Sequence, residues 1–222
     1  MRLYTFLKDE FNLTKSELIT FFTSHKILVN DKECELTTKI NELSTIKIDD
    51  KVYKIKDKDY IYIALNKPRG YECTNDKKNT NSILNLIDID LRVFCVGRLD
   101  KDSEGLIILT NDGAFSNQVL SPNHHVEKEY IVSTKEKIDN TFIENISRPQ
   151  KVLNKITKPC KAYLIDDYTF KIILTEGINR QIRRMTKNLG HTVISLKRIR
   201  FGNLKLDIEE KAYKFVKKEE II

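Results

Sequence analysis

A run at positions 95–106, with the sequence CVGRLDKDSEGL, constrains the fold of this chain more than any other segment. An apolar approach ends at Gly97-Arg98, the carboxylate Asp100 follows, and a second apolar run begins at Leu106. Apolar runs on both sides predict two buried strands, and the polar residues between them predict a turn. Asp100 is therefore expected on a loop that a rigid scaffold holds beside a cleft. By turn chemistry alone, the same aspartate would be only a turn or cap residue.

The charge of the chain indicates what kind of partner it binds. The net charge of +7 over 222 residues favours a polyanion, and nucleic acid is the natural candidate. The N-terminus has no long apolar stretch and carries charged residues from Arg2 onward. We therefore expect a soluble cytoplasmic protein with neither signal peptide nor membrane span.

Motifs that would bind metals or nucleotides are missing from the sequence. The adjacent His124 and His125 point to opposite sides of an extended segment, and no third ligand lies nearby. Neither a Gly-x-Gly-x-x-Gly string nor a Walker A string occurs. The four cysteines form no Cys-x-x-Cys pair and are typical of a reduced compartment. Of these, we expect three to behave as small buried hydrophobes, with Cys73 as the exception: Cys34, Cys95 and Cys160. We expect no metal and no cofactor.

The first 58 residues carry the pattern of a small separate domain. Apolar residues at helical spacing predict a helix within 3–11, and Thr14-x-x-Glu17 is a capping box that begins a second helix. Short strands are expected at 27–29, 46–48 and 52–55. The alternating charges of 56–59 predict a linker, which places the domain boundary between residues 58 and 59.

Residues 59–222 are predicted to form a larger α+β domain with a mainly antiparallel, mixed sheet. Alternation at 60–65 and apolar runs at 106–110 and 170–174 predict strands, and 114–120 predicts a helix. A further helix is expected between Asn179, as its N-cap, and Gly190. Four cations share one face of this helix, which would be a binding face or simply a solvated one: Arg180, Arg183, Arg184 and Lys187.

Four segments together resemble the motifs of one known family, in the family's order. They are Gly-Arg-Leu-Asp at 97–100, Asn-Lys-Pro-x-Gly at 66–70, Lys-x-Tyr at 128–130 and Asn-Arg-Gln-Ile-Arg-Arg-Met at 179–185. This series resembles the RsuA/RluB/RluE/RluF family of RNA pseudouridine synthases. The N-terminal segment resembles an S4 RNA-binding domain, although Lys15 stands where an Arg is common.

The resemblance implies roles for individual residues. Asp100 would be the catalytic residue, Arg183 would pair with it and keep it deprotonated, and Tyr130 would stack on the target base. Leu196 matches the aliphatic residue that helps to sandwich that base. Arg98 would contact RNA near the vacated position, and further basic residues would bind phosphates: Arg180, Arg184 and Lys15.

The reaction implied is the conversion of uridine to its C5-glycoside isomer within an RNA chain. The target base must leave the stack, after which Asp100 would add to the base or the ribose, or take a ribose proton. The expected partners of this monomer are rRNA or ribosomal assembly intermediates. The segment 92–107 looks most like the RluF branch, which acts on 23S rRNA, whereas 121–125 looks more like RsuA, which acts on 16S rRNA. A non-enzymatic RNA-binding or ribosome-assembly protein is the alternative from another class.

Overall fold

The computed structural model describes residues 1–11, 13–55, 59–121 and 123–222. Within them the chain divides into two compact units, Met1–Asp59 and Tyr60–Ile222. This division lies one residue beyond the predicted boundary, and residues 56–58 of the predicted linker lie outside the described residues. None of the described helices has the length and apolarity needed to cross a membrane.

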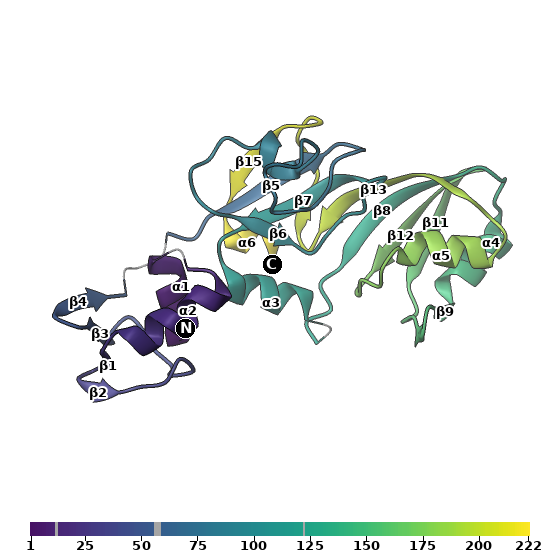
Figure 1. Ribbon diagram of the computed structural model, residues 1–222. Coiled ribbons are helices and arrows are strands. Elements are labelled where there is room, and N and C mark those ends of the chain that lie inside the picture. The colour runs from purple at the N-terminus through teal and green to yellow at the C-terminus, as the bar shows by residue number, and fades with distance from the viewer. Residues whose placement is uncertain (12, 56–58, 122) are drawn as a thin grey trace. The chain divides into compact units, whose positions relative to one another are not determined.

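The first unit packs two helices against a small antiparallel sheet (Figure 1). Its strands lie in the order β2-β1-β3-β4. Leu3, Leu7 and Ile46 are fully buried between the helices and the sheet. The elements are α1 (Leu3–Glu10), α2 (Lys15–Ser24), β1 (Ile27–Val29), β2 (Lys32–Glu33), β3 (Thr45–Ile48) and β4 (Lys51–Lys54).

The predicted start of the second helix is confirmed. The Thr14 hydroxyl accepts a hydrogen bond from the Glu17 backbone N–H at 3.4 Å, and the Glu17 carboxylate accepts one from the Thr14 N–H at 2.8 Å. Both N–H groups would otherwise lack partners at the helix start, which is why this pair of residue types marks it.

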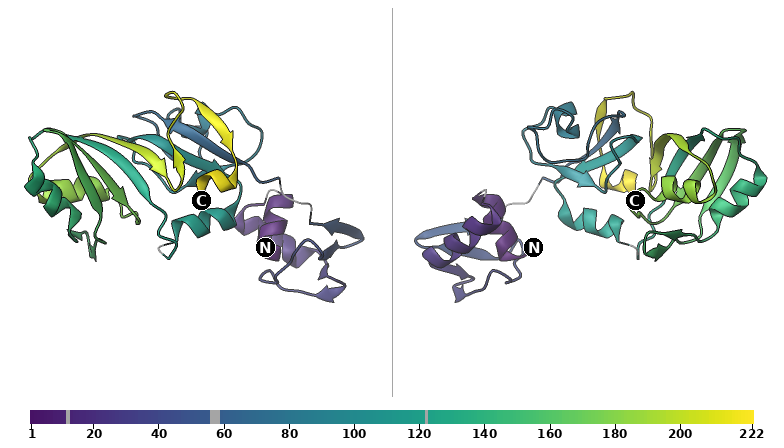
Figure 2. Two further views of the ribbon diagram at one scale, coloured as in Figure 1. Left: turned by 180° about the vertical axis from the view of Figure 1, so that it is seen from behind. Right: turned by 45° about the vertical axis from the view of Figure 1, so that its right-hand side comes forward.

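The second unit is built on a nine-stranded sheet (Figure 2). Its main path is β11-β12-β8-β13-β7-β5-β15, with β6 paired to β7 and β14 paired to β13; β9 and β10 form a separate hairpin. The predicted α+β fold with a mainly antiparallel sheet is confirmed. The elements are β5 (Tyr62–Lys67), η1 (Ile83–Leu86), β6 (Phe94–Val96), β7 (Glu104–Thr110), α3 (Gly113–Leu120), β8 (Lys128–Thr134), α4 (Asn140–Ser147), β9 (Lys151–Val152), β10 (Lys155–Ile156), β11 (Lys161–Asp166), β12 (Thr169–Leu174), α5 (Gln181–Asn188), β13 (Val193–Phe201), β14 (Leu204–Lys205), β15 (Tyr213–Val216) and α6 (Lys218–Ile221).

Strands β5 and β7 are neighbours in this sheet and are buried on both faces. Ile63 pairs with Leu109, and both contact the cluster that includes η1, while Ala64 and Ile108 contact the cluster that includes α3. Alternate residues of 60–65 thus face two different hydrophobic cores, instead of one core and the solvent. This double burial makes the strand pair a rigid base for the loops at its ends.

One parallel contact among the described strands brings distant segments together. β13 runs beside β7, with Lys197 opposite Glu104 and Arg198 opposite Gly105. Gly105 has a φ of +101°, and a Cβ built there would lie 2.3 Å from the Arg198 carbonyl oxygen. Only glycine permits this approach, which sets β13 beside the loop that carries Asp100.

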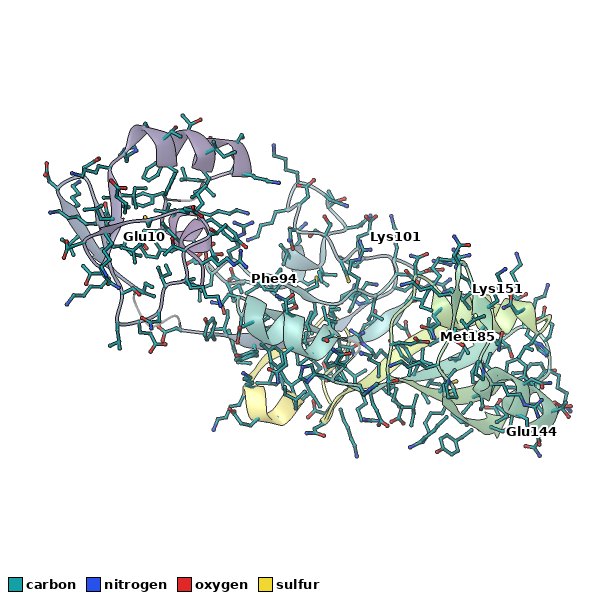
Figure 3. The ribbon with its side chains drawn as sticks, turned by 90° about the horizontal axis from the view of Figure 1, so that it is seen from below. Glu10, Phe94, Lys101, Glu144, Lys151 and Met185 are labelled. Atoms are coloured by element: carbon teal, nitrogen blue, oxygen red, sulfur yellow. The ribbon has the colours of Figure 1, made fainter. Side chains whose placement is uncertain are left out.

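Helices α4 and α5 belong to the end of the second unit formed by β11 and β12. Asp139 caps α4 by accepting a hydrogen bond from the Phe142 N–H at 2.8 Å. Met185 of α5 is fully buried, whereas Glu144 of α4 is exposed at the outside of the unit (Figure 3). Packing on one side of α5 fixes the start of this helix relative to β13.

Candidate active site

Asp100 lies on the loop between β6 and β7, as the sequence predicts. The turn closes with a 3.0 Å hydrogen bond from the Ser103 N–H to the Asp100 carbonyl. Leu99 beside it is buried, while the Asp100 side chain is 29% exposed. The loop is thus anchored by an apolar side chain and presents its carboxylate to solvent-accessible space.

Lys67 holds this loop from beneath. Its side chain is fully buried at the end of β5, and its ammonium donates to the carbonyls of Ser103 at 2.5 Å and Pro68 at 3.1 Å. Burial lowers the pKa of Lys67, and the acidic groups around the loop counteract that effect. Sequence reasoning assigned no role to this lysine, although a lysine that ends an apolar strand before a proline was a usable signal.

A pair of thiols also supports the loop. The Cys73 sulfur accepts a hydrogen bond from the Leu99 N–H at 3.3 Å, one residue before Asp100. The hydrogen bond from the Cys95 thiol lowers the pKa of Cys73, and the same interaction raises the pKa of Cys95. The expectation that Cys34, Cys95 and Cys160 are buried is wrong, because each is only partly buried. The Cys95 thiol also hydrogen-bonds the neighbouring sulfur of Cys73.

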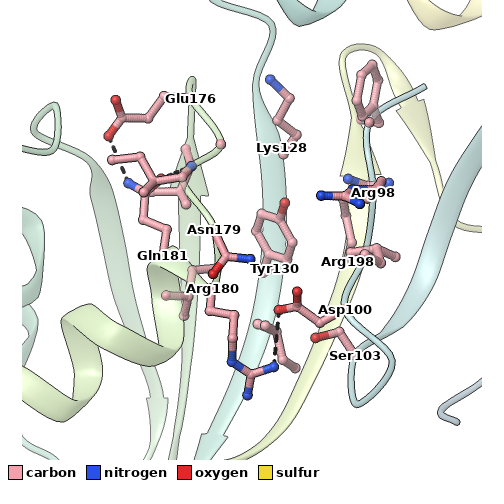
Figure 4. A pocket seen from close by; sticks show the side chains of 18 of the residues that line it. Arg98, Asp100, Ser103, Lys128, Tyr130, Glu176, Asn179, Arg180, Gln181 and Arg198 are labelled. Atoms are coloured by element: carbon pink, nitrogen blue, oxygen red, sulfur yellow. Dashed lines mark hydrogen bonds and ion pairs between the residues drawn. The ribbon is translucent and has the colours of Figure 1, made fainter. Parts of the chain in front are cut away.

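Arg180 is the cation that pairs with Asp100. Its guanidinium lies 3.7 Å from an Asp100 carboxylate oxygen (Figure 4). The same group donates two parallel hydrogen bonds to Asp102, at 3.0 and 2.9 Å. These bonds are the main cause of the lowered pKa of Asp102. Such a two-point contact fixes the orientation of the guanidinium beside Asp100.

The predicted pairing of Arg183 with Asp100 is wrong. Arg183 is 11% exposed and donates to the backbone carbonyls of Asp102 at 2.9 Å and Val193 at 3.2 Å. Its Nε lies 3.5 Å from the Asp102 carboxylate. Arg183 starts inside α5 and hydrogen-bonds the backbone of both the loop and β13, so it ties these segments together and pairs with Asp102 rather than with Asp100.

The prediction that Asn179 is the N-cap of α5 is also wrong. The cap residue is Arg180, which adopts a left-handed conformation with a φ of +51° and makes no side-chain cap hydrogen bond. Gln181 holds the preceding turn instead: its side chain accepts from the Ile178 N–H at 3.0 Å and donates to Glu176 at 2.8 Å. Arg180 therefore lies before the helix, although its guanidinium and that of Arg183 both lie within ion-pair distance of the Asp102 carboxylate.

Tyr130 and Leu196 line the same cavity as Asp100. This cavity has a volume of about 440 Å³ and is also lined by Arg98 and Arg180. In the β8–β13 pair, Tyr130 lies opposite Arg198 and Val132 opposite Leu196, so these side chains share one face of the sheet. Leu196 is 6% exposed. An aromatic and an aliphatic side chain thus border the carboxylate, as a planar base would require.

Two predicted phosphate-binding residues lie outside this cavity. Arg184 donates to the Asn179 carbonyl at 3.1 Å and does not line the cavity. Lys15 is exposed at the first position of α2, in the other unit. Arg98 is exposed at the cavity edge. The described residues include no group of three His, Cys, Asp or Glu side chains that could hold a metal.

Sequence reasoning missed two cations that line the cavity. Lys128 is 8% exposed and Arg198 is 3% exposed. Lys128 stands in the Lys-x-Tyr segment, in which the family resemblance implies a role for the tyrosine alone, and Arg198 lies in a segment to which only Leu196 contributes a predicted site residue. Burial of two cations in one cavity could not be inferred from either segment alone, because it depends on the pairing of β8 with β13.

Comparison with known proteins agrees with the family that the motifs indicate. The model of the RNA pseudouridylate synthase family matches residues 61–188. The chain is 32% identical over 207 residues to the dual-specificity RNA pseudouridine synthase RluF of Escherichia coli (strain K12), covering 93% of this chain and 71% of that protein. It is 30% identical over 230 residues to the ribosomal small subunit pseudouridine synthase A of Haemophilus influenzae, covering 100% of this chain and 98% of that protein.

A solved structure supports the same relationship. A crystal structure of a pseudouridylate synthase superimposes with a TM-score of 0.72 at 29% sequence identity, covering 100% of this chain and 98% of that one. Both the family match and these relatives include the segments that carry Asp100 and Tyr130. The chain therefore belongs to the RNA pseudouridylate synthase family and is a pseudouridine synthase.

Proposed function

We propose that this enzyme converts a specific uridine of ribosomal RNA to pseudouridine, with Asp100 as its catalytic carboxylate. One observation carries the proposal: Asp100, Tyr130 and Leu196 come from three separate segments and line one cavity. A turn or cap aspartate would need neither an aromatic nor an aliphatic neighbour in a cavity. The cavity instead fits a flipped base held beside a carboxylate.

In this proposal each side chain has a distinct task. Tyr130 and Leu196 bind the flipped uracil, and the Asp100 carboxylate acts on the base or the ribose. The glycosidic bond to N1 breaks, the uracil turns and C5 bonds to the ribose; the C5 proton then leaves and N1 takes up a proton. Atoms are conserved and no electrons are gained or lost. Arg180, held by Asp102, orients the Asp100 carboxylate.

We assign RNA binding to the first unit, as an S4-like domain. It has its own core, formed only by residues of 1–55. Lys15 is exposed at the start of α2 and is suited to phosphate contact. We expect this unit to bind and position folded RNA and not to take part in catalysis, because none of the candidate catalytic residues lies in it.

For the target we favour 23S rRNA of the large subunit. The relatives named RluF are 32% identical to this chain over most of its length, and the segment 92–107 is most like that branch. The relative named for the small subunit matches over the whole chain at 30% identity. 16S rRNA is therefore the second candidate.

Mapping pseudouridine in rRNA tests both the reaction and the target. Ribosomal RNA would be compared between cells that carry the gene and cells that lack it, and between rescue with the natural gene and with Asp100→Asn. The proposal expects one uridine of 23S rRNA to lose modification without the gene and to regain it only with the natural gene. Loss in 16S rRNA would overturn the target alone, and unchanged modification of all rRNA would overturn the substrate.

A further inference from the structure

Two buried cations occupy the cavity on the side away from the Asp100–Arg180 pair. The Lys128 ammonium lies 5.5 Å from the centre of the Phe201 ring, and the Arg198 guanidinium lies 5.4 Å from it. Both side chains are more than nine-tenths buried and line the cavity (Figure 4), and Phe201 lines it as well. Two like charges share one ring in a poorly solvated place.

Hydrogen bonds leave part of this pair without a partner. Arg198 donates from Nε to the Leu106 carbonyl at 2.6 Å, but one terminal nitrogen of its guanidinium is buried with no hydrogen-bond acceptor. Among the described residues, the Lys128 ammonium has no hydrogen bond or ion pair. A buried donor without an acceptor costs free energy that a bound acceptor would return.

Carboxylates of the cavity do not neutralise the pair. Asp100 is paired with Arg180, and Glu176 accepts hydrogen bonds from Gln181 and from the Lys158 N–H. Burial, followed by the positive charge of Arg198, lowers the pKa of Lys128 to about 8. Because neither carboxylate pairs with Lys128 or Arg198, the positive charge of these two side chains is not compensated there. This favours an anionic ligand over a neutral carbonyl group.

We propose that Lys128 and Arg198 form an anion subsite that binds the phosphate attached to the ribose of the target uridine. The inference rests on the proposed function, because the phosphate belongs to the RNA substrate. Arginine and lysine bind phosphate oxygens by charge-assisted hydrogen bonds. Arg98, exposed at the cavity edge and without an ion pair among the described residues, lies where the chain of the RNA would enter.

The strand register places this subsite beside the base platform. Arg198 is directly opposite Tyr130, and Lys128 precedes Tyr130 by two positions on the same face of β8. Two strand positions span about 7 Å. A nucleotide whose base contacts Tyr130 would thus present its phosphate to the cations while its ribose faces Asp100. The subsite would select a nucleotide held in one orientation.

Binding of small uridine compounds to the full-length protein tests the subsite without turnover. Uridine, uridine 5′-monophosphate, uridine 3′-monophosphate and inorganic phosphate would each be titrated by calorimetry. We expect one monophosphate to bind at least about tenfold more tightly than uridine, with inorganic phosphate competing for it. In Lys128→Met this advantage should fall to about twofold or less while uridine affinity stays the same, and Lys128→Arg should restore it.

Lys205→Met removes an exposed lysine of β14 outside the cavity and should leave every affinity unchanged. Circular dichroism of each variant would establish that it is folded. Monophosphates that bind no more tightly than uridine would overturn the subsite, and so would an advantage that survives in Lys128→Met. Inorganic phosphate that binds wild type and Lys128→Met equally would also overturn the subsite, because it would show non-specific attraction. Failure of the proposed function would appear differently, as missing pseudouridine despite an intact preference for the monophosphate.

Discussion

Arg180 lies 3.7 Å from Asp100, although it stands outside α5 in a left-handed backbone conformation. Two hydrogen bonds to Asp102 hold it there. Arg180→Met removes the cation nearest the Asp100 carboxylate. We expect the single-turnover rate at saturating RNA to fall about tenfold, or ~1.4 kcal/mol of barrier.

Two neighbouring arginines are the controls for that variant. Arg184→Met should weaken RNA binding and flatten its salt dependence, with an unchanged single-turnover rate. Arg183→Met should mainly lower the melting temperature, because Arg183 is 11% exposed and ties two backbone carbonyls together. A rate at saturating RNA that is full in Arg180→Met but reduced in Arg184→Met would contradict these roles.

Gly105→Ala should destabilise the second unit. The new Cβ would lie 2.3 Å from the Arg198 carbonyl oxygen, and the φ of +101° is unfavourable for alanine. We expect a loss of at least about 3 kcal/mol in the free energy of unfolding, measured in urea. Gly113→Ala is the matched control, since its added Cβ would lie within 4 Å of no atom beyond its chain neighbours and its own helix backbone, and it should change stability by less than about 1 kcal/mol. Equal stabilities of the two variants would refute the close approach of β13 to β7.

The pKa of Lys128 predicts a pH dependence of stability. Burial and Arg198 lower it to about 8 from an ordinary value of 10.5. Between these two values the unfolded chain binds more protons than the native protein, so native stability rises with pH. The stability of the wild type relative to Lys128→Met should therefore be flat below about pH 8 and increase toward about pH 10. Urea unfolding of both proteins across this pH range measures this dependence. If the difference in unfolding free energy between wild type and Lys128→Met does not change with pH, the pKa of Lys128 is not lowered in the native protein.

Deleting residues 1–59 should weaken RNA binding and leave the catalytic rate of the remaining unit nearly unchanged. Among the described residues, the core of the first unit includes none from the second, so the remainder should still unfold cooperatively. Affinity for an rRNA fragment should fall at least about tenfold, while the single-turnover rate at saturation should stay within about threefold. Unchanged affinity and site choice would refute the RNA-binding role, and an unfolded remainder would refute the domain boundary.

Local chemistry explains which elements could be predicted from the sequence. The capping box at Thr14 and Glu17 begins α2, because both side chains act within one turn. The polar turn at Asp100 lies between two apolar runs that became β6 and β7. The resemblance to the family motifs also predicts residues around the cavity, because the types and order of the motifs indicate a site that hydrophobic periodicity alone does not.

Tertiary contacts explain what could not be predicted. Periodicity places Arg180 and Arg183 on one helical face, and both lie within ion-pair distance of Asp102. It could not show that Arg180, which precedes α5 in a left-handed turn, is the one paired with Asp100. Lys67 and Lys128 look like surface lysines in the sequence and are buried in the fold. Their environment depends on strands that are distant in the chain, so no local pattern reports it.

Asp100→Asn tests the central claim most directly. The variant keeps the size of the side chain and removes its negative charge, so the chemistry should stop while RNA still binds. The reaction expels the C5 proton, so RNA labelled with tritium at C5 of uridine reports turnover by release of tritium to water. Purified wild-type enzyme should release tritium from the labelled rRNA, and Asp100→Asn should release none above background while it binds the same RNA within about threefold of wild-type affinity. Substantial tritium release by Asp100→Asn would contradict the assignment of Asp100 as the catalytic carboxylate.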